Sequence, residues 1–458
     1  MSAKTATAAN PLGLVAVIGL AIVVAVPFIF IVLQAIFPQI GQGVFSAPFV
    51  HLPALFEDPK LLRMTGNTIL LGVSVVVLSA IIAVPLAVFR ALYKVPLATP
   101  GLAASLLLVF ASAIEEYDTP AALGSRSGFD VLVTEIDLRI SDWPIDLSGA
   151  AVFSLALVLL SLAAFMLQRW ILTRRSYVTT GGKPQNKDKR DLGAFKVPVV
   201  ILFGGAFAAT GVPLLAILAT AMSKTVSGGL TLSNLGFDNF ADIADNSAGA
   251  MRAFTNTLSL GVASALLTGL LVAIAAYAVV KMRCRGRFWF DVLTVLPNSL
   301  PGVVVAVGLI LAWNQPSLLI SPYNTPLILL LAYCCILLPQ SIRYATAAFH
   351  QIGDNLEAAA RVCVASSFRT FRRIILPLIA PSLITQMLLV FAVATRELVA
   401  STLVAPVGMQ TISIFIWRQF EQGSIGLGMA MAFIAILLTT LPPLLLMGLL
   451  KRTGLVKV

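Results

Sequence analysis

The sequence predicts an all-α membrane protein, a polytopic helical bundle of about ten transmembrane helices in two unequal repeats. Only 11% of its 458 residues are charged and 59% are hydrophobic, with a mean hydropathy of +0.96. Soluble domains carry about a quarter charged residues, so this chain cannot be solvated as a globule. Its apolar runs approach or exceed the roughly 18 residues that cross a bilayer.

The predicted transmembrane helices follow these apolar runs in chain order. The first follows a short polar stretch that carries only Lys4. It is too long for the apolar core of a cleaved signal peptide, so we expect a retained helix. The predicted spans are Leu14–Phe37, Ile69–Phe89, Leu97–Ile114, Ala150–Leu167, Val197–Met222, Leu258–Val280, Val292–Trp313, Leu327–Leu338, Leu383–Leu403 and Leu427–Leu450.

The distribution of basic residues predicts the topology. With the N-terminus inside, most of the 31 lysines and arginines fall in cytoplasmic loops and most of the 20 acids fall outside. This matches the positive-inside rule and predicts a multi-pass bacterial inner-membrane protein with both termini in the cytoplasm. The basic loops contain no aromatic-interleaved patch, which argues against nucleic-acid binding.

The four cysteines predict neither a disulfide nor a metal site. They map to spans or to the cytoplasmic side, where thiols stay reduced, and their spacing is not that of metal ligands. They are Cys284, Cys334, Cys335 and Cys363.

The chain contains an internal repeat. Asn67-Thr68 recurs as Asn256-Thr257, and each pair opens a long apolar run. A second block, from Pro96 to Ala111, recurs from Pro377 to Ala392. Between the two blocks the first half has only residues 91–95, whereas the second half has residues 280–376, which hold two spans and a cytoplasmic loop. Transporters are often built from duplicated halves, and here the first half is shortened.

The predicted organisation therefore has three parts. Residues 1–170 form a shortened repeat of about four helices, and residues 197–458 form a repeat of about six helices. Residues 171–196 join them and contain Gly181, Gly182, Pro184 and mixed charge, which is the composition of a flexible linker.

The cytoplasmic loop 347–377 has the most informative pattern. Asp354 and Glu357 have capping-box spacing, in which the first residue caps a helix and the second reaches back. The alanines Ala358 and Ala359 would give the helix a smooth, close-packing face. Ser366-Ser367 supplies a break or a new cap, and Pro377 would start the next membrane helix. On these features alone, an ordinary loop helix fits equally well.

The wider pattern resembles a known family. Glu-Ala-Ala at 357–359, a basic and aromatic stretch after it, and Ile375-Leu376-Pro377 closely resemble the signature loop of permeases of type I ATP-binding-cassette importers. The second half looks like such a permease throughout. The two-half arrangement resembles the fused ferric-iron-type permeases.

The resemblance implies that the loop docks into a cleft on an ATPase subunit. The coupling residues would then be Asp354, Glu357, Ala358, Ala359, Arg361, Cys363 and Pro377. It also implies a dimer of ABC ATPase subunits and a periplasmic substrate-binding protein as partners, with ferric iron as substrate. The sequence contains no phosphate-binding loop, so ATP and Mg are expected on the partner ATPase and no cofactor in this chain.

The chain departs from the family pattern at two points. Cys363 stands where the family usually has glycine, so fewer backbone conformations are open to the turn after the helix. The first half has no such loop at all. Either a single coupling loop suffices, or the chain is a shortened, inactive relative.

Two charge pairs are candidate translocation residues, because charge inside a membrane span is costly and functional by default. Arg396 and Glu397 are predicted within the span after the loop, and Glu115 and Glu116 hold the equivalent places in the first half. Facing each other across a pseudo-twofold axis, they would line a gate. The alternative is a helix end whose charges pair locally or reach the headgroups.

Three other functions stay open. A secondary transporter driven by an ion gradient would also show repeats and intramembrane charge, and only the loop pattern argues against it. A membrane-embedded enzyme would need a catalytic constellation, and with two isolated histidines we predict no catalytic residues. A non-transporting remnant is the third. The substrate is open as well, since thiamine, polyamine, phosphonate and oxyanion permeases share the architecture.

Overall fold

The computed structural model describes residues 18–40, 43–45, 47–50, 53, 58–92, 109–110, 112–124, 127–173, 196–229, 231–280, 301–315, 318–350, 352, 355–363 and 366–452. Within these residues every regular element is a helix, apart from one isolated bridge between Ser223 and Leu235. Seven of the described helices are long and apolar enough to cross a membrane, which confirms an all-helical, polytopic protein. They are Ile18–Ile36, Pro59–Ile81, Leu147–Leu167, Ser247–Tyr277, Pro326–Phe349, Phe368–Ala394 and Ile425–Pro442.

Three of the ten predicted spans are described only in part: Leu14–Phe37, Leu97–Ile114 and Val292–Trp313. Most of Leu97–Ile114 lies outside the described residues, as do residues 14–17, residues 292–300 and Cys284. Two shorter apolar helices, Gly211–Ala221 and Gly302–Trp313, lie in the predicted spans Val197–Met222 and Val292–Trp313. The number of ten spans therefore stays a prediction.

The chain divides into two compact units, Met1–Ser46 with Thr220–Val458, and Ala47–Ala219. This division differs from the predicted repeats, because the first predicted helix belongs to the unit that contains the second half. The boundaries 1–170 and 197–458 stay a prediction. Residues 174–195 of the predicted linker lie outside the described residues.

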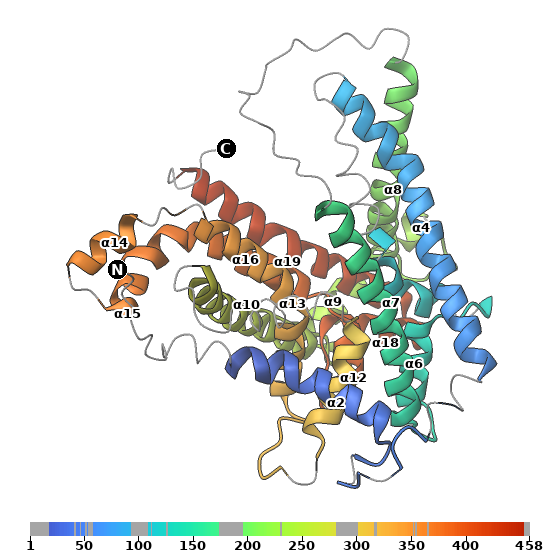
Figure 1. The fold of residues 1–458 in the computed structure, drawn as a ribbon. Helices are drawn as coiled ribbons and strands as arrows, with labels where there is room; N and C mark the ends of the chain where they lie inside the picture. Colours follow the sequence, from blue (N-terminus) through green and yellow to red (C-terminus); the bar gives the residue numbers. More distant parts are fainter. Residues whose placement is uncertain are drawn as a thin grey trace. The chain divides into compact units, whose positions relative to one another are not determined.

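The larger unit is a bundle of long helices (Figure 1). Within it α10 packs against α13 and α16, and α12 packs against α2 and α17. The contact between α2 and α12 is close, since a Cβ on Gly308 would lie 2.7 Å from the Pro27 carbonyl oxygen. Its elements are η1 (Ala21–Ala25), α2 (Val26–Ile36), η6 (Leu232–Asn234), α9 (Asp238–Ala244), η7 (Ser247–Gly249), α10 (Ala250–Val280), α12 (Gly302–Trp313), α13 (Pro326–His350), α14 (Asn355–Val362), α15 (Ser367–Thr370), η9 (Phe371–Ile375), α16 (Leu376–Ala394), α17 (Val399–Val404), α18 (Ile412–Glu421) and α19 (Ile425–Arg452).

The smaller unit contains α4 (Pro59–Leu92), η3 (Pro120–Gly124), α6 (Leu132–Ser141), α7 (Leu147–Thr173) and most of α8 (Lys196–Ala221). Arg139 of α6 holds the corner between α6 and α7. Its Nε lies 2.9 Å from Glu135 Oε1 and its Nη1 lies 2.7 Å from Asp146 Oδ2. The guanidinium also stacks over the ring of Phe153, 4.4 Å from its centre.

The repeat is visible in the hydrogen bonds of both halves. In the first half, Asn67 Nδ2 donates to the carbonyl oxygen of Asp130 at 2.7 Å. The next residue, Thr68, accepts the backbone N–H of Leu132 at 2.9 Å. These two bonds tie α4, two turns after its first residue, to the start of α6.

The second half contains the same pair of bonds. Asn256 Nδ2 donates to the carbonyl oxygen of Gln410 at 2.9 Å, and Thr257 accepts the backbone N–H of Ile412 at 2.8 Å. They tie α10 to α18. The pairs Asn67-Thr68 and Asn256-Thr257, which revealed the repeat in the sequence, thus make equivalent contacts.

A close glycine contact also recurs. A Cβ on Gly72 would lie 2.7 Å from the Phe110 ring, and a Cβ on Gly261 would lie 3.0 Å from the Phe391 ring. In each half the glycine admits a neighbouring aromatic ring that a larger residue would displace. The second repeated block therefore packs against the first in both halves.

Candidate coupling site and translocation residues

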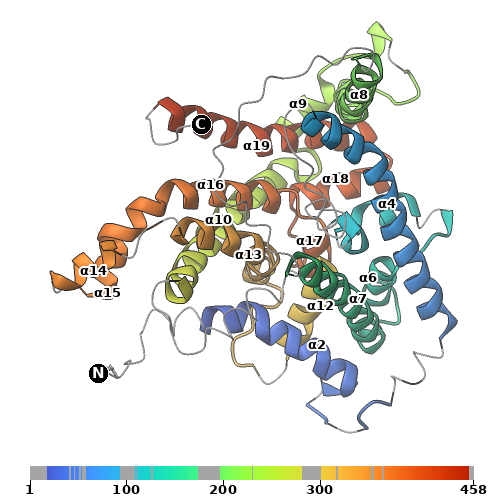
Figure 2. The ribbon, with the colours of Figure 1, turned by 45° about the horizontal axis from the view of Figure 1, so that its top comes forward.

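The helix α14 lies between α13, which ends at His350, and α15. Figure 2 shows α14 and α15 at the end of α16 that is remote from α17. Ala360 is buried, whereas Ala359 and Cys363 are exposed. Asp354 lies outside the described residues, and so do the side chains of Glu357, Ala358 and Arg361. Their capping and coupling roles stay predictions.

The region around α14 exposes large apolar side chains. Leu356 is 43% exposed, Val362 is 83% exposed and Phe368 is 57% exposed. Clustered exposed hydrophobic residues are typical of surfaces that bind a partner. We call these three residues with Ala359 the coupling face.

A buried aromatic cluster holds the base of this loop. The ring centre of Tyr277, from α10, lies 4.9 Å from that of Phe371 and 6.0 Å from that of Phe349. Phe349 lies at the end of α13 and Phe371 begins η9, so the cluster ties both ends of the loop to α10. Sequence reasoning missed Tyr277, because no spacing rule links residues so far apart.

The membrane helix after the loop begins earlier than predicted. Ser366 Oγ accepts the backbone N–H of Arg369 at 3.3 Å, which confirms a new cap at this serine. From Ser367, helix α15, the π turn η9 and α16 follow without a break. Pro377 lies at the second position of α16, as predicted for the start of that helix, but the helical turns of α15 and η9 precede it. The π turn ends with a bond from Leu376 N–H to the Phe371 carbonyl, and such a wide turn tolerates a residue without an N–H.

The same helix also ends earlier than predicted, at Ala394 and not at Leu403. The backbone N–H groups of Arg396 and Glu397 bond to the carbonyls of Val393 and Ala394 in a tight closing turn. Both residues therefore lie in the break before α17, and the prediction that they lie within a span is wrong. Because apolar residues flank the break on both sides, the hydropathy of the sequence did not reveal it.

The Glu397 side chain lies beside the first residue of α12. Its Oε1 accepts the N–H of Ala400 at 3.2 Å and would lie 3.8 Å from a Cβ on Gly302, the first residue of α12. A helix N-terminus favours a nearby carboxylate. The Tyr333 hydroxyl of α13 lies 2.6 Å from Ser401 Oγ, which in turn donates to the Glu397 carbonyl at 2.6 Å. Sequence reasoning missed Tyr333 and Ser401.

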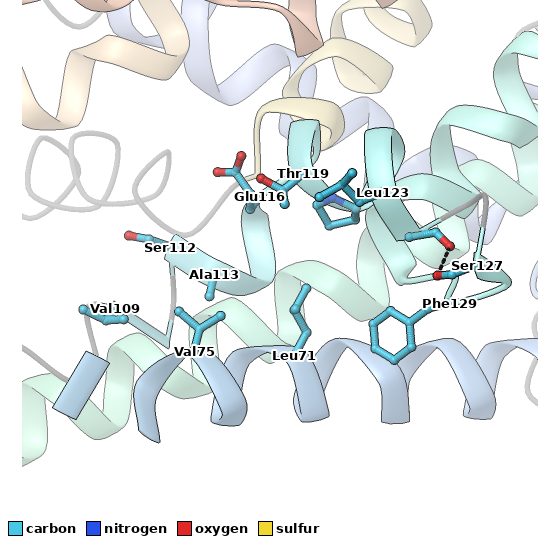
Figure 3. Close-up of a pocket in the computed structure, with 12 residues that line it drawn as sticks. Leu71, Val75, Val109, Ser112, Ala113, Glu116, Thr119, Leu123, Ser127 and Phe129 are labelled. Carbon is cyan, nitrogen blue, oxygen red and sulfur yellow. Dashed lines mark hydrogen bonds between the residues drawn. The ribbon is translucent and has the colours of Figure 1, made fainter. Parts of the chain in front are cut away.

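The first-half pair lies at the equivalent break. Glu115 ends the helical turn 112–115, and Glu116 follows it. Glu116 lies on the wall of a cavity of about 680 Å³ in the smaller unit (Figure 3). That Glu115 and Glu116 face Arg396 and Glu397 across an axis stays a prediction, because the two pairs belong to different compact units.

Residues 265–453 match the family model of the binding-protein-dependent transport system inner membrane component. The chain is 29% identical over 343 residues to a ferric transport system permease protein, FbpB, of Actinobacillus pleuropneumoniae, covering 74% of this chain and 49% of the relative. It is 30% identical over 307 residues to a protein named putative ferric transport system permease protein FbpB 1 in Haemophilus influenzae, covering 66% of this chain and 48% of the relative. The chain thus spans about half the length of these two relatives.

Two further matches cover most of shorter proteins. A putative 2-aminoethylphosphonate transport system permease protein, PhnV, of Salmonella typhi is 25% identical over 53% of this chain and 90% of the relative. A solved structure of a bacterial ABC transporter involved in the import of the acidic polysaccharide alginate has a TM-score of 0.44 and 16% identity, covering 58% of this chain and 98% of that chain.

The helical membrane fold and the matched segment define a membrane transport component. Residues 265–453 belong to the family of binding-protein-dependent transport inner membrane components, with distant homology to ferric permeases over most of the chain. This is the transmembrane component and not the ATPase, as the sequence predicted. The protein is a multi-pass inner-membrane protein.

Proposed function

We propose that the chain is the membrane-spanning permease subunit of an ATP-binding-cassette importer of the type I fold. Its partners are ABC ATPase subunits on the cytoplasmic side, where both termini lie, and a periplasmic protein that delivers the substrate. The observation that carries this proposal is the position of α14 and its coupling face inside the family segment 265–453.

One helical stretch joins Phe368 of the coupling face to the break that contains Glu397. The stretch Ser367–Ala394 is about 42 Å long at a rise of about 1.5 Å per residue. Phe368 lies at its start, and Glu397 lies just beyond its end. In this proposal a movement of α14 passes to Phe368 and then along this stretch toward the start of α12.

The mechanism we propose is alternating access. Closure of the ATPase dimer on ATP pulls α14, and the aromatic cluster of Tyr277, Phe349 and Phe371 transmits the pull to α10, α13 and α16. The shift at Glu397 then opens the bundle toward the binding protein. Because the cluster is buried, it moves as one body with the helix ends that it joins.

Ferric iron is the proposed substrate. The two ferric relatives match a larger share of this chain than the phosphonate relative does. The carboxylates of Glu116 and Glu397 also suit a cation, since hard metal ions prefer oxygen ligands. Uptake of radioactive ferric iron and of 2-aminoethylphosphonate, each with its own binding protein, separates the two substrates. Uptake of phosphonate alone would overturn the iron assignment.

Coupling is tested by co-purification with the ATPase. We expect Glu357→Arg to abolish co-purification, because it reverses a charge on the helix proposed to enter the ATPase cleft. Asp245→Arg is the matched control, since Asp245 is exposed in the turn after α9. If Glu357→Arg left ATPase binding and uptake intact, the coupling role of α14 would be refuted.

Cys363 offers a second, independent measurement. It is exposed at the end of α14, while Cys334 and Cys335 are buried. In a Cys284→Ser background, a maleimide should label Cys363 readily in the free chain. We expect labelling to slow by about tenfold when the ATPase is bound, which corresponds to about 1.4 kcal/mol of protection. Equal labelling with and without the ATPase contradicts docking at this face.

A second candidate function is a permease relative that assembles without transporting. It is favoured by one observation: the first half has only residues 91–95 at the place where the second half holds residues 280–376. Such a chain would bind the ATPase and protect Cys363, yet would support uptake of neither iron nor phosphonate.

A further inference from the structure

Three arginines lie in the first turns of the helical stretch that follows the coupling loop. They are Arg369 of α15 and Arg372 and Arg373 of η9, and all three side chains are exposed. Arg369 precedes the other two by three and four residues, a spacing that brings side chains to the same side of a helix. We call these three residues the arginine cluster.

The uncharged length that follows the arginine cluster sets its depth in a membrane. The candidate span Phe368–Ala394 has 27 residues and begins with the turns that carry the cluster. Residues 374–394 contain no charged side chain and are about 31 Å long at a rise of about 1.5 Å per residue. They alone cross the hydrocarbon core of a bilayer, which is about 30 Å thick. The arginine cluster therefore lies at the depth of the lipid headgroups.

The positive charge of the cluster is not neutralised by the residues that the structure describes. Every ion pair between described side chains involves Arg139 or Lys224. The described acids of the larger unit lie in or just after α9, in the break after α16 and at the end of α18. Figures 1 and 2 show α9 and α18 far from α15. An anion from outside the chain would meet an uncompensated charge here.

We propose that the arginine cluster binds the headgroup phosphate of an anionic phospholipid. Guanidinium groups bind phosphate oxygens in pairs of charge-assisted hydrogen bonds, and they suit this ligand better than lysine does. Leu378 follows Arg373 along the stretch, toward the hydrocarbon core, and is 55% exposed. It offers an apolar surface to an acyl chain. The ligand thus combines a phosphate with an apolar tail.

A second helix adds an arginine beside this site. Helix α13 packs against α16, and its residues Arg343 and Tyr344 are exposed. Arg343 lies about 9 Å before Phe349 along α13, and Arg373 lies about 3 Å after Phe371, at a rise of about 1.5 Å per residue. The aromatic cluster joins Phe349 to Phe371 through Tyr277, so both arginines lie on its membrane side. Basic sites between membrane helices at the cytoplasmic surface are typical of headgroup binding.

The depth of the cluster favours a lipid over the proposed ATPase partner. Helix α14, which carries most of the coupling face, precedes the span that begins at Phe368. The arginines come after that point, next to the hydrocarbon core, where lipid headgroups are the nearest anions. The distribution of basic residues predicts that this end of the bundle is cytoplasmic, and the cytoplasmic leaflet carries anionic lipids.

Titration of the purified full chain with lipid, followed by native mass spectrometry, tests the site. The probes are dioleoyl phosphatidylglycerol and dioleoyl phosphatidylcholine, which differ in headgroup charge. We expect the unaltered chain to bind the anionic lipid at least about tenfold more tightly. Changing all three arginines of the cluster to glutamine should weaken this binding by about a hundredfold, since each basic side chain near the surface contributes about fivefold, or about 1 kcal/mol.

Arg252→Gln is the matched control. Arg252 is exposed near the start of α10, about 37 Å before Tyr277 at a rise of about 1.5 Å per residue, and should leave the affinity unchanged. Equal binding of the two lipids overturns the proposal, and so does an equal loss with Arg252→Gln. If the triple variant does not fold, Arg373→Gln alone should weaken binding of the anionic lipid by about fivefold. An unchanged affinity in that variant also overturns the site.

Competition with inorganic phosphate distinguishes a lipid from a soluble anion. Phosphate lacks the acyl chains that Leu378 would contact, so it should not displace phosphatidylglycerol at equal concentration. Leu378→Ser should weaken binding of this lipid by about fivefold, through the lost apolar contact. Displacement by phosphate, together with no effect of Leu378→Ser, would assign the cluster to a soluble anion and overturn the lipid site.

The lipid site and the permease function fail separately. A chain that prefers phosphatidylglycerol through its arginines, yet whose Cys363 is never protected by the ATPase, keeps the lipid site and refutes coupling through α14. A chain whose Cys363 is protected but which shows no lipid preference refutes the lipid site alone. If the triple variant kept its lipid affinity and lost co-purification with the ATPase, the cluster would belong to the ATPase interface and the lipid site would be overturned.

Discussion

The break that follows Glu115 in the first half and the break that follows Ala394 in the second half occupy equivalent places in the repeat but have different neighbours. Each comes at the end of an apolar helical segment and carries a glutamate, Glu116 or Glu397. In the second half α12 begins beside the glutamate and α13 bonds to the turn after it. In the first half Glu116 lines the cavity of the smaller unit.

The comparison distinguishes the contacts that keep each half folded from the contacts that connect a half to the coupling loop. The bonds of Asn67 and Thr68 tie α4 to α6 without the missing segment, just as those of Asn256 and Thr257 tie α10 to α18. A shortened half can therefore keep its fold and lose its coupling loop. Among the residues that the structure describes, the second half adds to these the contacts of α12, α13 and the aromatic cluster.

The largest expected effect concerns that cluster. Phe371→Ala removes a buried ring from contact with Tyr277, and large-to-small changes of this kind cost about 3–5 kcal/mol. Phe368→Ala is the matched control, because its ring is 57% exposed and should cost less than about 0.5 kcal/mol. Thermal unfolding in detergent measures both. Similar losses for the two variants would show that the cluster does not anchor the loop.

The second prediction compares the repeated threonines. Thr68→Val and Thr257→Val each leave a backbone N–H, of Leu132 or Ile412, without its acceptor in a buried place. An unsatisfied buried donor costs about 1–3 kcal/mol, and we expect the same loss in both halves. Hydrogen exchange at the two amides reports the site directly. A loss confined to Thr257→Val would mean that the first half is held by other contacts.

The smallest expected effect concerns a buried and an exposed position of the repeat. Val404→Ala removes two buried methyl groups, about 1.6 kcal/mol at roughly 0.8 kcal/mol per group. Leu123→Ala at the equivalent place should cost less than about 0.5 kcal/mol, because Leu123 is largely exposed. Thermal unfolding in detergent measures both. If Leu123→Ala cost as much as Val404→Ala, Leu123 would be packed against the rest of the chain.

The two halves also show which structural features could be predicted from the sequence. The repeated Asn-Thr pairs could be recognised in the sequence, and their hydrogen bonds proved equivalent. In each half the pair lies inside a long helix and bonds to the backbone around the first residue of a later helix. The position of Arg396 and Glu397 was predicted wrongly. A run of apolar residues on both sides of a tight turn has the same hydropathy as a continuous span, so hydropathy alone cannot reveal the break.

The sequence by itself determined that this protein is a helical membrane protein, that it contains an unequal repeat, and that one loop carries the permease pattern. Composition, recurrence and local motifs are properties of the chain in one dimension. Only the tertiary structure decided that Tyr277 joins Phe349 and Phe371, that Glu397 lies at the start of α12, and that Glu116 lines a cavity beside α4. These features depend on which distant segments pack together.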